Sequence, residues 1–244
     1  MIAIQTIDLE KRYKEKIAVN KLNLSIEQGE LFSLLGVNGA GKTTTIKMLS
    51  CLSSPTSGDA ILLGDSIVKN SFGVKEKIGV SPQETAVAPN LTVKENLTLI
   101  AELYGANKKD AAKKVDEMIE SFRLSEVVKS KAKTLSGGWQ RRLSIAMALI
   151  SEPQILFLDE PTLGLDVIAR RELWAVAKEL KGEITIILTT HYLEEAEALS
   201  DRIGIMAKGE LKAVGTAKEL MASTSTQNFE DAFISFSTGG GISI

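Results

Sequence analysis

This 244-residue sequence has little of several features that would place a protein in a particular class. It contains one cysteine, Cys51, so no disulfide can form within the chain and a reducing, cytoplasmic setting is expected. Its uninterrupted apolar runs, such as 145–150, fall far short of the roughly 20 residues of a membrane-spanning helix. Residues 1–8 lack the basic start and long apolar core of a secretion signal. Any membrane role is therefore expected to need another polypeptide.

Neither sign of charge dominates the sequence. There are 29 Lys and Arg residues against 31 Asp and Glu residues, which gives a net charge of −2. This balance offers no reason to expect nucleic acid as a partner. The lysines within 108–114 and 129–133 are expected on solvated helix and loop surfaces. The length and the 44% hydrophobic content suit one large domain with a sizeable core.

Apolar periodicity predicts an α/β fold. Segments 2–9 and 18–26 alternate between apolar and polar residues, as half-buried strands do, whereas 31–35 is continuously apolar and suits a strand buried on both faces. A short antiparallel strand is expected at 60–63. Strands at 155–158 and 184–189 with a helix at 167–181 between them form a βαβ pattern, and 203–206 with 210–214 form a hairpin.

The remaining segments are mainly helical. Residues 90–122 have helical spacing of apolar residues, and a further helix is expected at about 137–150, before the stop at Glu152-Pro153. The tail, 223–244, has only weak signals. The sequence shows no internal repeat and no interdomain linker.

A glycine-rich segment follows the apolar run 31–35 and opens a helix that runs to about Leu49. Its glycines allow a tight turn whose N–H groups can point at phosphate oxygens. Lys42 is expected to reach the β- and γ-phosphates, and the hydroxyl group of Thr43 to bind Mg²⁺. The alternative is a strand-to-helix turn without a ligand. The candidate nucleotide-binding residues are Gly36, Asn38, Gly39, Ala40, Gly41, Lys42, Thr43 and Thr44.

Two further segments carry candidate site residues. Asp159 and Glu160 end an apolar strand, where Asp159 could contribute to Mg²⁺ binding and Glu160 could face an attacking water, or both could be surface acids. Ser136-Gly137-Gly138 suits close approach of backbone to an anion at a helix N-terminus. For Ser136 the alternative is simple helix capping.

The order of these segments resembles the ATP-binding cassette (ABC) ATPases over nearly the whole chain. Three segments carry the resemblance: the glycine-rich loop, the segment Leu135-Ser136-Gly137-Gly138-Trp139-Gln140, and the strand 155–160 that ends in two acidic residues. It implies a P-loop NTPase (RecA-like) core with an N-terminal antiparallel β subdomain and a helical insertion at about 84–132. The cassette would span 1–222, with 223–244 as a C-terminal tail.

The resemblance also assigns roles to residues that mean little alone. Gln83 matches the glutamine that contacts Mg²⁺ and water, and the single histidine, His191, matches the one that senses the γ-phosphate. Tyr13 matches the aromatic residue that stacks on adenine. Asp166 matches the loop that crosses the dimer interface. Ser136, Gly137 and Gly138 would face ATP held by a partner chain, which implies two ATP molecules sandwiched in a head-to-tail dimer.

Three positions depart from the pattern of the family. Val37 stands where Pro or Ser is frequent, Trp139 where a polar residue or Met is commoner, and Leu163 where Ser is usual. None of the three removes a candidate catalytic group. The expected set of catalytic residues is Lys42, Gln83, Glu160 and His191.

The resemblance implies an exporter-type subunit that hydrolyses ATP, with Mg²⁺, to power transport through a separate integral-membrane subunit. The chain would be cytoplasmic and peripheral on the membrane, paired with itself or with a related cassette. Alternatives are a soluble cassette of cofactor assembly and a metabolic P-loop kinase, although a kinase leaves 135–140 unexplained.

The loop 85–91 is a candidate docking site for the membrane subunit, with Val87 exposed. Alternatively, Val87 packs against the insertion's own helices.

Overall fold

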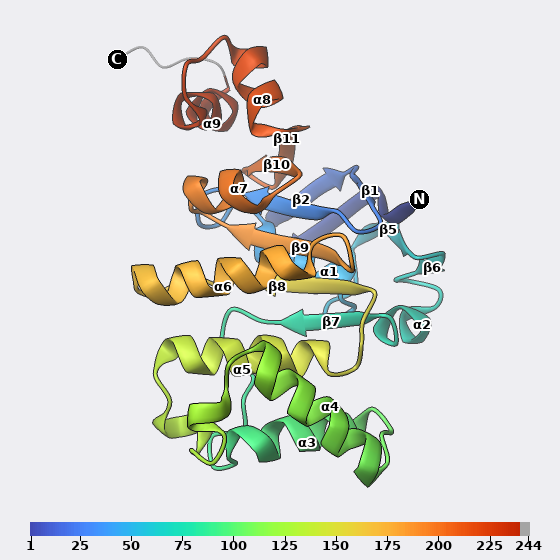
Figure 1. The fold of residues 1–244 in the computed structure, drawn as a ribbon. Coiled ribbons are helices and arrows are strands. Elements are labelled where there is room, and N and C mark those ends of the chain that lie inside the picture. Colours follow the sequence, from blue (N-terminus) through green and yellow to red (C-terminus); the bar gives the residue numbers. More distant parts are fainter. Residues whose placement is uncertain (240–244) are drawn as a thin grey trace.

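A six-stranded, mostly parallel sheet forms the centre of the protein (Figure 1). The computed structural model describes residues 1–239. The strand order is β11-β10-β4-β9-β8-β7, in which only β11 runs antiparallel to its neighbour. The strands are β4 (Leu31–Leu35), β7 (Ile78–Ser81), β8 (Ile155–Asp159), β9 (Thr185–Thr190), β10 (Arg202–Ala207) and β11 (Glu210–Gly215). The expected α/β class is confirmed.

Helices cover both faces of this sheet, as the continuously apolar strands require. Ile155 and Phe157 of β8 pack into a cluster with α1 (Lys42–Leu49), whereas Leu156 and Leu158 pack into a second cluster with α5 (Gly137–Leu149). Successive side chains of a strand point to opposite faces. Helices α1 and α5 therefore lie on opposite faces of the sheet.

The N-terminal residues form a second, antiparallel sheet in the order β2-β1-β5-β6, with β3 also paired to β1. Its strands are β1 (Ile2–Tyr13), β2 (Lys16–Leu22), β3 (Ser25–Glu27), β5 (Ser57–Leu62) and β6 (Asp65–Ser66). The segment predicted as one strand at 18–26 is divided into β2 and β3. At the division the Thr6 hydroxyl group donates to the Leu22 carbonyl and accepts from the Leu24 amide, so a side chain replaces the regular ladder.

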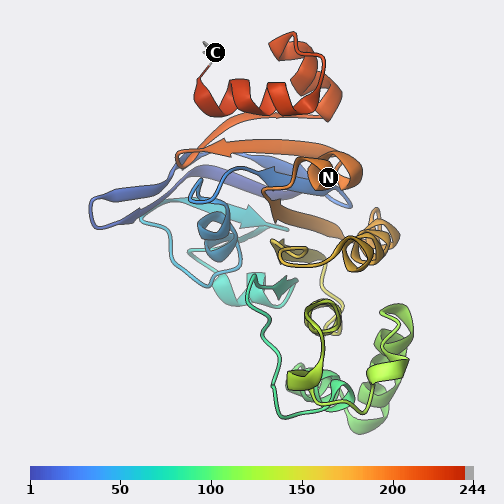
Figure 2. The same ribbon diagram turned by 90° about the vertical axis from the view of Figure 1, so that its left-hand side faces the viewer.

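A helical group lies apart from both sheets, at the lower end in Figures 1 and 2. It contains α3 (Val93–Leu103) and α4 (Lys108–Ser121), preceded in the chain by the short α2 (Ser71–Lys75) and followed by two 3-10 turns, Ser125–Val127 and Ala132–Thr134. The pattern 90–122 is broken at Gly105, which has φ of 87°, and Asn107 caps α4. Helices α3 and α4 lie within the insertion expected at about 84–132, whereas α2 precedes it.

Two helices lie in the C-terminal part of the described chain, although its sequence signals are weak. After α6 (Val167–Leu180) and α7 (Leu193–Leu199) come α8 (Ala217–Thr224) and α9 (Phe229–Thr238). Leu220 and Phe229 pack with Leu35 of β4, so both helices are anchored to the central sheet. The division expected between 222 and 223 falls within α8, and residues 240–244 of the expected tail lie outside the described residues.

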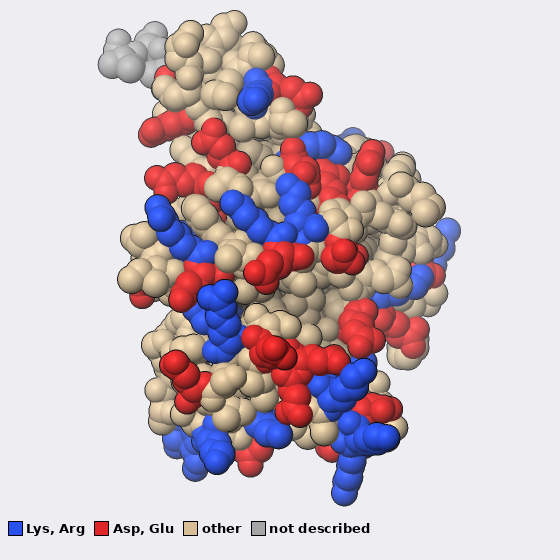
Figure 3. All heavy atoms as spheres, viewed as in Figure 1, with Lys and Arg blue, Asp and Glu red and all other residues tan. Residues whose placement is uncertain are grey.

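Basic and acidic side chains are interspersed on the face of the molecule in Figure 3. In the helical group, Lys94 pairs with Asp116 and Lys113 pairs with Glu117. Within residues 1–239, the longest helices are too short and too polar to span a lipid bilayer.

Candidate functional site: a phosphate-binding cleft at the ends of parallel strands

An open cleft of about 930 Å³ lies around the loop between β4 and α1. Gly41 caps α1 with φ of 109°, and a Cβ atom on it would lie 2.5 Å from the Ala18 carbonyl oxygen, so only glycine fits here. The cleft is lined by Tyr13, Lys16, Ala18, Asn38, Gly39, Ala40, Gly41, Lys42, Thr43, Thr44, Gln83, Glu160 and Leu163. The loop thus lies where the sequence predicts a phosphate site.

Three charged or titratable side chains meet beside this loop. Lys42 Nζ lies 3.3 Å from Glu160 Oε1, and Glu160 Oε2 lies 3.1 Å from His191 Nδ1. Lys42 also donates to the Gly36 carbonyl at 2.7 Å. Lys42 is the first residue of α1, which follows β4, whereas Glu160 and His191 directly follow β8 and β9. The C-terminal ends of these three strands meet at one edge of the sheet, as is usual for ligand sites in parallel sheets.

A second polar chain runs beside the first. The Thr43 hydroxyl group donates to Asp159 Oδ1 at 3.1 Å, and the Thr189 hydroxyl group donates to the same oxygen at 2.5 Å. Asp159 is 4% exposed, and Oδ1 is oriented by two hydroxyl groups. No group of three His, Cys, Asp or Glu residues able to hold a metal occurs in residues 1–239. Mg²⁺ is commonly held by one or two carboxylates together with substrate phosphates, so the pair of Thr43 and Asp159 fits it.

Glu160 has a backbone conformation that few residues adopt. Its φ is 46°, in the left-handed region, and its amide donates to the Thr189 hydroxyl group at 3.0 Å. Such a conformation costs on the order of 1–3 kcal/mol and persists only where neighbouring structure holds it. Here it turns the carboxylate toward Lys42 and His191 instead of continuing the strand.

Arg141, which is not among the site residues predicted from the sequence, holds the loop that carries Gln83. It is 5% exposed and donates to the carbonyl groups of Pro82 and Gln83, at 2.6 Å each. Burial lowers the pKa of Arg141, and the charge of Asp159 opposes this effect. The sequence signal that could have identified Arg141 is its position within the helix expected at 137–150, on the side that packs against the sheet. Lys16 was also missed, although it pairs with Tyr13 across the β1–β2 turn.

The residues Ser136, Gly137 and Gly138 are not among those that line this cleft. They begin α5, on the face of the sheet opposite α1, and Ser136 and Gly137 are exposed. Ser136 occupies the N-cap position of α5, as the capping alternative requires, but its side chain makes no capping hydrogen bond. Its hydroxyl group therefore does not have the structural role that the alternative gives it.

The structure also places two residues of the loops expected at the membrane contact and at the dimer interface, Val87 and Asp166. Val87 is partly buried and packs against the cluster of the helical insertion, so the alternative reading of this residue is correct and its expected exposure is wrong. Asp166 accepts hydrogen bonds from the amides of Ile168 and Ala169, at 2.9 Å each, and so caps α6. Leu163, in the same loop as Asp166, lines the cleft.

The sequence has close relatives among characterised proteins. Residues 19–163 match the ABC transporter family. The chain is 42% identical over 218 residues to the linearmycin resistance ATP-binding protein LnrL of Bacillus subtilis, an alignment that covers 89% of this chain and 70% of LnrL. It is 43% identical over 204 residues to the human phospholipid-transporting ATPase ABCA3, covering 84% of this chain but only 12% of ABCA3. The chain thus spans a small part of that larger protein.

A solved structure shares the fold. The dimeric cassette MJ0796, in a post-hydrolysis state bound to ADP and phosphate, matches 87% of this chain and 98% of its own, with a TM-score of 0.79 and 28% identity. The fold, the phosphate loop with its converging acids, and these similarities agree. The chain belongs to the ABC transporter family and is an ATP-binding cassette ATPase.

Proposed function

We propose that this chain is the ATP-hydrolysing subunit of an exporter and works as a head-to-tail dimer with two ATP molecules between the chains. The observation that carries the proposal is the separation of its two phosphate-binding elements. Lys42 and Thr43 lie at the cleft, while Ser136 and the glycines after it start a helix on the other face of the sheet. The phosphate loop and the Ser136 segment of one chain therefore cannot contact the same nucleotide. In a head-to-tail dimer, the phosphate loop of one chain can face the Ser136 segment of the other.

Mg²⁺ is proposed to bind with ATP through Thr43, Asp159 and Gln83. The hydroxyl group of Thr43 already points at Asp159, and Gln83 lines the same cleft. When bound, Mg²⁺ would neutralise charge on the phosphates as the phosphoryl group is transferred. Tyr13 is 47% exposed at the rim of the cleft, where its ring can stack on adenine.

Glu160 is proposed to orient and deprotonate the attacking water, with His191 holding its carboxylate. In this step the water oxygen forms a bond to the γ-phosphorus, the bond to the β,γ-bridging oxygen breaks, and ADP and phosphate leave. Lys42 lies against Glu160 and can move its charge to the phosphates when they bind. Ser136 of the second chain would add hydrogen-bond donors at the γ-phosphate.

The direction of transport and the class of substrate are inferred from the relatives. LnrL confers linearmycin resistance and ABCA3 transports phospholipids. We infer that this chain powers efflux of an amphipathic molecule through a separate membrane subunit, and that it lies on the cytoplasmic face of the membrane through that subunit.

A groove between the core and the helical insertion is the proposed docking site for the membrane subunit. It has a volume of about 970 Å³, and its lining includes Leu52, Ala86, Ile100 and Tyr104. Leu52 and Tyr104 are 65% and 59% exposed. Ala86 lies three residues after Gln83, so the loop joins the nucleotide cleft to this groove. A short apolar helix of the membrane subunit fits such a surface.

The test is purification of the full-length chain, tagged, from detergent-solubilised membranes of the native cell. The expected result is an integral-membrane polypeptide in a fixed ratio to the chain, in a complex whose ATPase rate changes with added transport substrate. A matched purification from the soluble fraction serves as the control. A stable complex found only there, with enzymes of cofactor assembly, would reject the transport role.

A further inference from the structure

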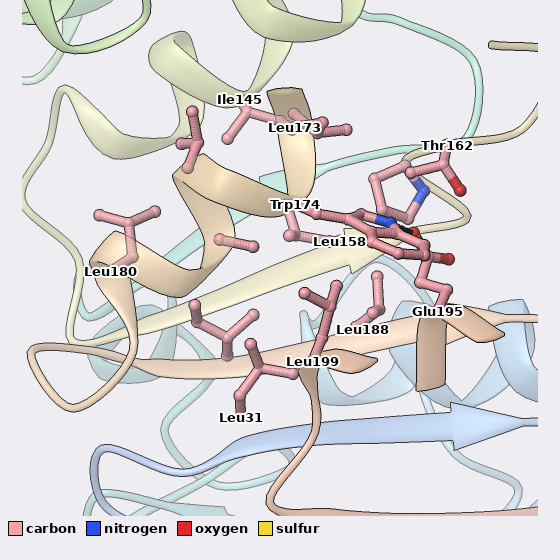
Figure 4. Close-up of a pocket in the computed structure, with 14 residues that line it drawn as sticks. Leu31, Ile145, Leu158, Thr162, Leu173, Trp174, Leu180, Leu188, Glu195 and Leu199 are labelled. Carbon is pink, nitrogen blue, oxygen red and sulfur yellow. Dashed lines mark hydrogen bonds between the residues drawn. The ribbon is translucent and has the colours of Figure 1, made fainter. Parts of the chain in front are cut away.

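A buried carboxyl group joins the helix after His191 to the helix after the loop 163–166. Glu195 of α7 is 0% exposed, although its neighbours Glu194 and Glu197 are at the surface. Figure 4 shows Glu195 and Trp174 pointing toward each other at one end of an otherwise apolar cavity. No step proposed above uses either residue.

The carboxyl group is held from one side. Trp174 Nε1 donates to Glu195 Oε1 at 2.9 Å. Among the described residues, Glu195 Oε2 and Thr162 Oγ1 are both buried without a hydrogen-bond partner. Burial raises the pKa of Glu195, and the hydrogen bond from Trp174 and the charge of Arg170 oppose this effect. One hydrogen bond offsets only part of the cost of removing this carboxyl group from water. Stability alone therefore does not explain a buried acid at this position.

A second contact lies one helical turn away. The guanidinium carbon of Arg170 lies 5.0 Å from the centre of the Tyr192 ring, within range of a cation–π interaction. Arg170 and Trp174 are four residues apart on α6, so they share a face. Tyr192 and Glu195 are three residues apart at the start of α7. We call these four residues the α6–α7 clamp.

The two helices that the clamp joins lead to different parts of the dimeric site. Helix α7 starts two residues after His191, which contacts Glu160 at 3.1 Å. Helix α6 is capped by Asp166, and its first turn lies against the start of α5. A Cβ atom at Gly138 would be 3.2 Å from Cβ of Ala169. The clamp thus bridges the histidine of one nucleotide site and the Ser136 segment that serves the other.

We propose that Glu195 is a positioning residue, and that its hydrogen bond with Trp174 sets His191 relative to the loop 163–166 and the Ser136 segment. Loss of this bond would leave each half of the site intact but misaligned when the dimer closes. The inference depends on ATP hydrolysis by this chain and not on its membrane partner.

The experiment measures ATP hydrolysis by the full-length chain and its variants. Trp174→Phe keeps an aromatic ring and removes the donor, and Glu195→Ala removes the acceptor. Each is expected to lower kcat by about 10- to 100-fold, the scale of misplacement remote from the chemistry. KM should stay within about twofold, since nucleotide binding to one chain is untouched. Glu195→Gln keeps an oxygen that can accept from Trp174 and should restore most of kcat.

Leu180→Ala is the matched control, because Leu180 lines the same cavity at its other end (Figure 4). It should lower Tm as much as the test variants while kcat is retained. The double variant of Trp174→Phe with Glu195→Ala should be no slower than the worse single variant, as coupled residues require.

Equal kcat loss in Leu180→Ala, a Glu195→Gln variant as slow as Glu195→Ala, or wild-type kcat in Trp174→Phe would each overturn the inference. Each of these comparisons is made against the ATPase rate of the wild-type chain. A wild-type chain without ATPase activity would contradict the proposed function itself, which distinguishes that failure from a failure of this inference.

Discussion

Glu160 Oε2 and His191 Nδ1 lie 3.1 Å apart, although their residues come from the ends of different strands, β8 and β9. The contact fixes one carboxylate oxygen, while the other faces Lys42 at 3.3 Å. A carboxylate held at both oxygens is pre-aligned for a single direction of attack. This arrangement places Glu160 at the centre of the proposed chemistry.

Glu160→Gln is expected to keep ATP binding and to lower hydrolysis by roughly 10²–10⁴-fold, the usual contribution of a positioned general base. Because bound ATP is no longer cleaved, the variant should accumulate as a dimer with Mg-ATP, visible by gel filtration. Lys42→Ala is the control, since it should remain monomeric under the same conditions. Wild-type turnover in Glu160→Gln would remove Glu160 from the reaction.

Ser136→Arg is expected to abolish hydrolysis while the affinity of the monomer for ATP stays nearly unchanged. The reason is that Ser136 lies outside the cleft of its own chain. Lys42→Ala should instead lose ATP binding, because Lys42 lies among the residues that line the cleft. Titration with a fluorescent ATP analogue separates the two effects. Equal loss of affinity in both variants would contradict the composite site.

Mixing the Ser136→Arg and Lys42→Ala chains sharpens this test. A mixed dimer has one composite site with an intact phosphate loop and an intact Ser136 segment. Gel filtration with Mg-ATP should therefore show a mixed dimer in amounts that neither variant forms alone. A mixture that remains monomeric, like each variant by itself, would contradict an exchange of elements between the chains.

Arg141→Ala is expected to loosen the loop that carries Gln83, because two backbone carbonyl groups lose their buried partner. Loss of a charged, buried hydrogen-bonding group costs about 2–5 kcal/mol, which thermal unfolding can detect. The rate of ATP hydrolysis should fall by more than the loss of folded protein explains. Ser144→Ala is a suitable control, since Ser144 lies in the same helix and its hydroxyl group bonds the Ser81 hydroxyl group.

Much of the site was predictable because its signals are local in sequence. A continuous apolar run gives β4, and a glycine-rich turn directly after it gives the start of α1. Asp159 and Glu160 follow from their place at the end of an apolar run. In each case a few adjacent residues determine both the backbone and the chemistry.

The parts that were missed depend on contacts between distant segments. Glu195 lies in the run Glu194-Glu195-Ala196-Glu197, which reads as a solvated acidic helix, and only the packing of α7 against α6 turns it inward. Its spacing of four residues from the buried Leu199 was the one available signal. Val87 was misjudged for the same reason, since the insertion that covers it is formed by later residues.

The effect of Glu195 on stability is expected to depend on pH. Its pKa in the folded state is raised above the reference value of 4.5, so the folded state binds more protons than the unfolded state above that pH. Its contribution to stability therefore falls as pH rises from about 4.5 through the folded-state pKa, and it is largest at low pH. Glu195→Gln should consequently gain stability relative to wild type as pH rises.

Denaturant unfolding of both proteins between pH 5 and pH 8 would measure this difference. Other shifted groups, such as Glu30 and Cys51, are present in both proteins and cancel. A difference that is independent of pH would mean that Glu195 does not titrate across this range in the folded state.

The proposed docking groove makes a prediction that separates surface from core. Leu52→Asp and Tyr104→Asp should leave the ATPase rate and Tm of the purified chain nearly unchanged, because both side chains are mostly exposed. They should weaken association with the membrane subunit, since a charge would be buried in an apolar contact.

Val87→Asp should instead lower Tm, because Val87 packs against the insertion. Ile2→Asp is a matched control, as Ile2 is 52% exposed on the N-terminal sheet, outside the groove. Co-purification with the membrane subunit that was equal in all four variants and wild type would place the docking site elsewhere.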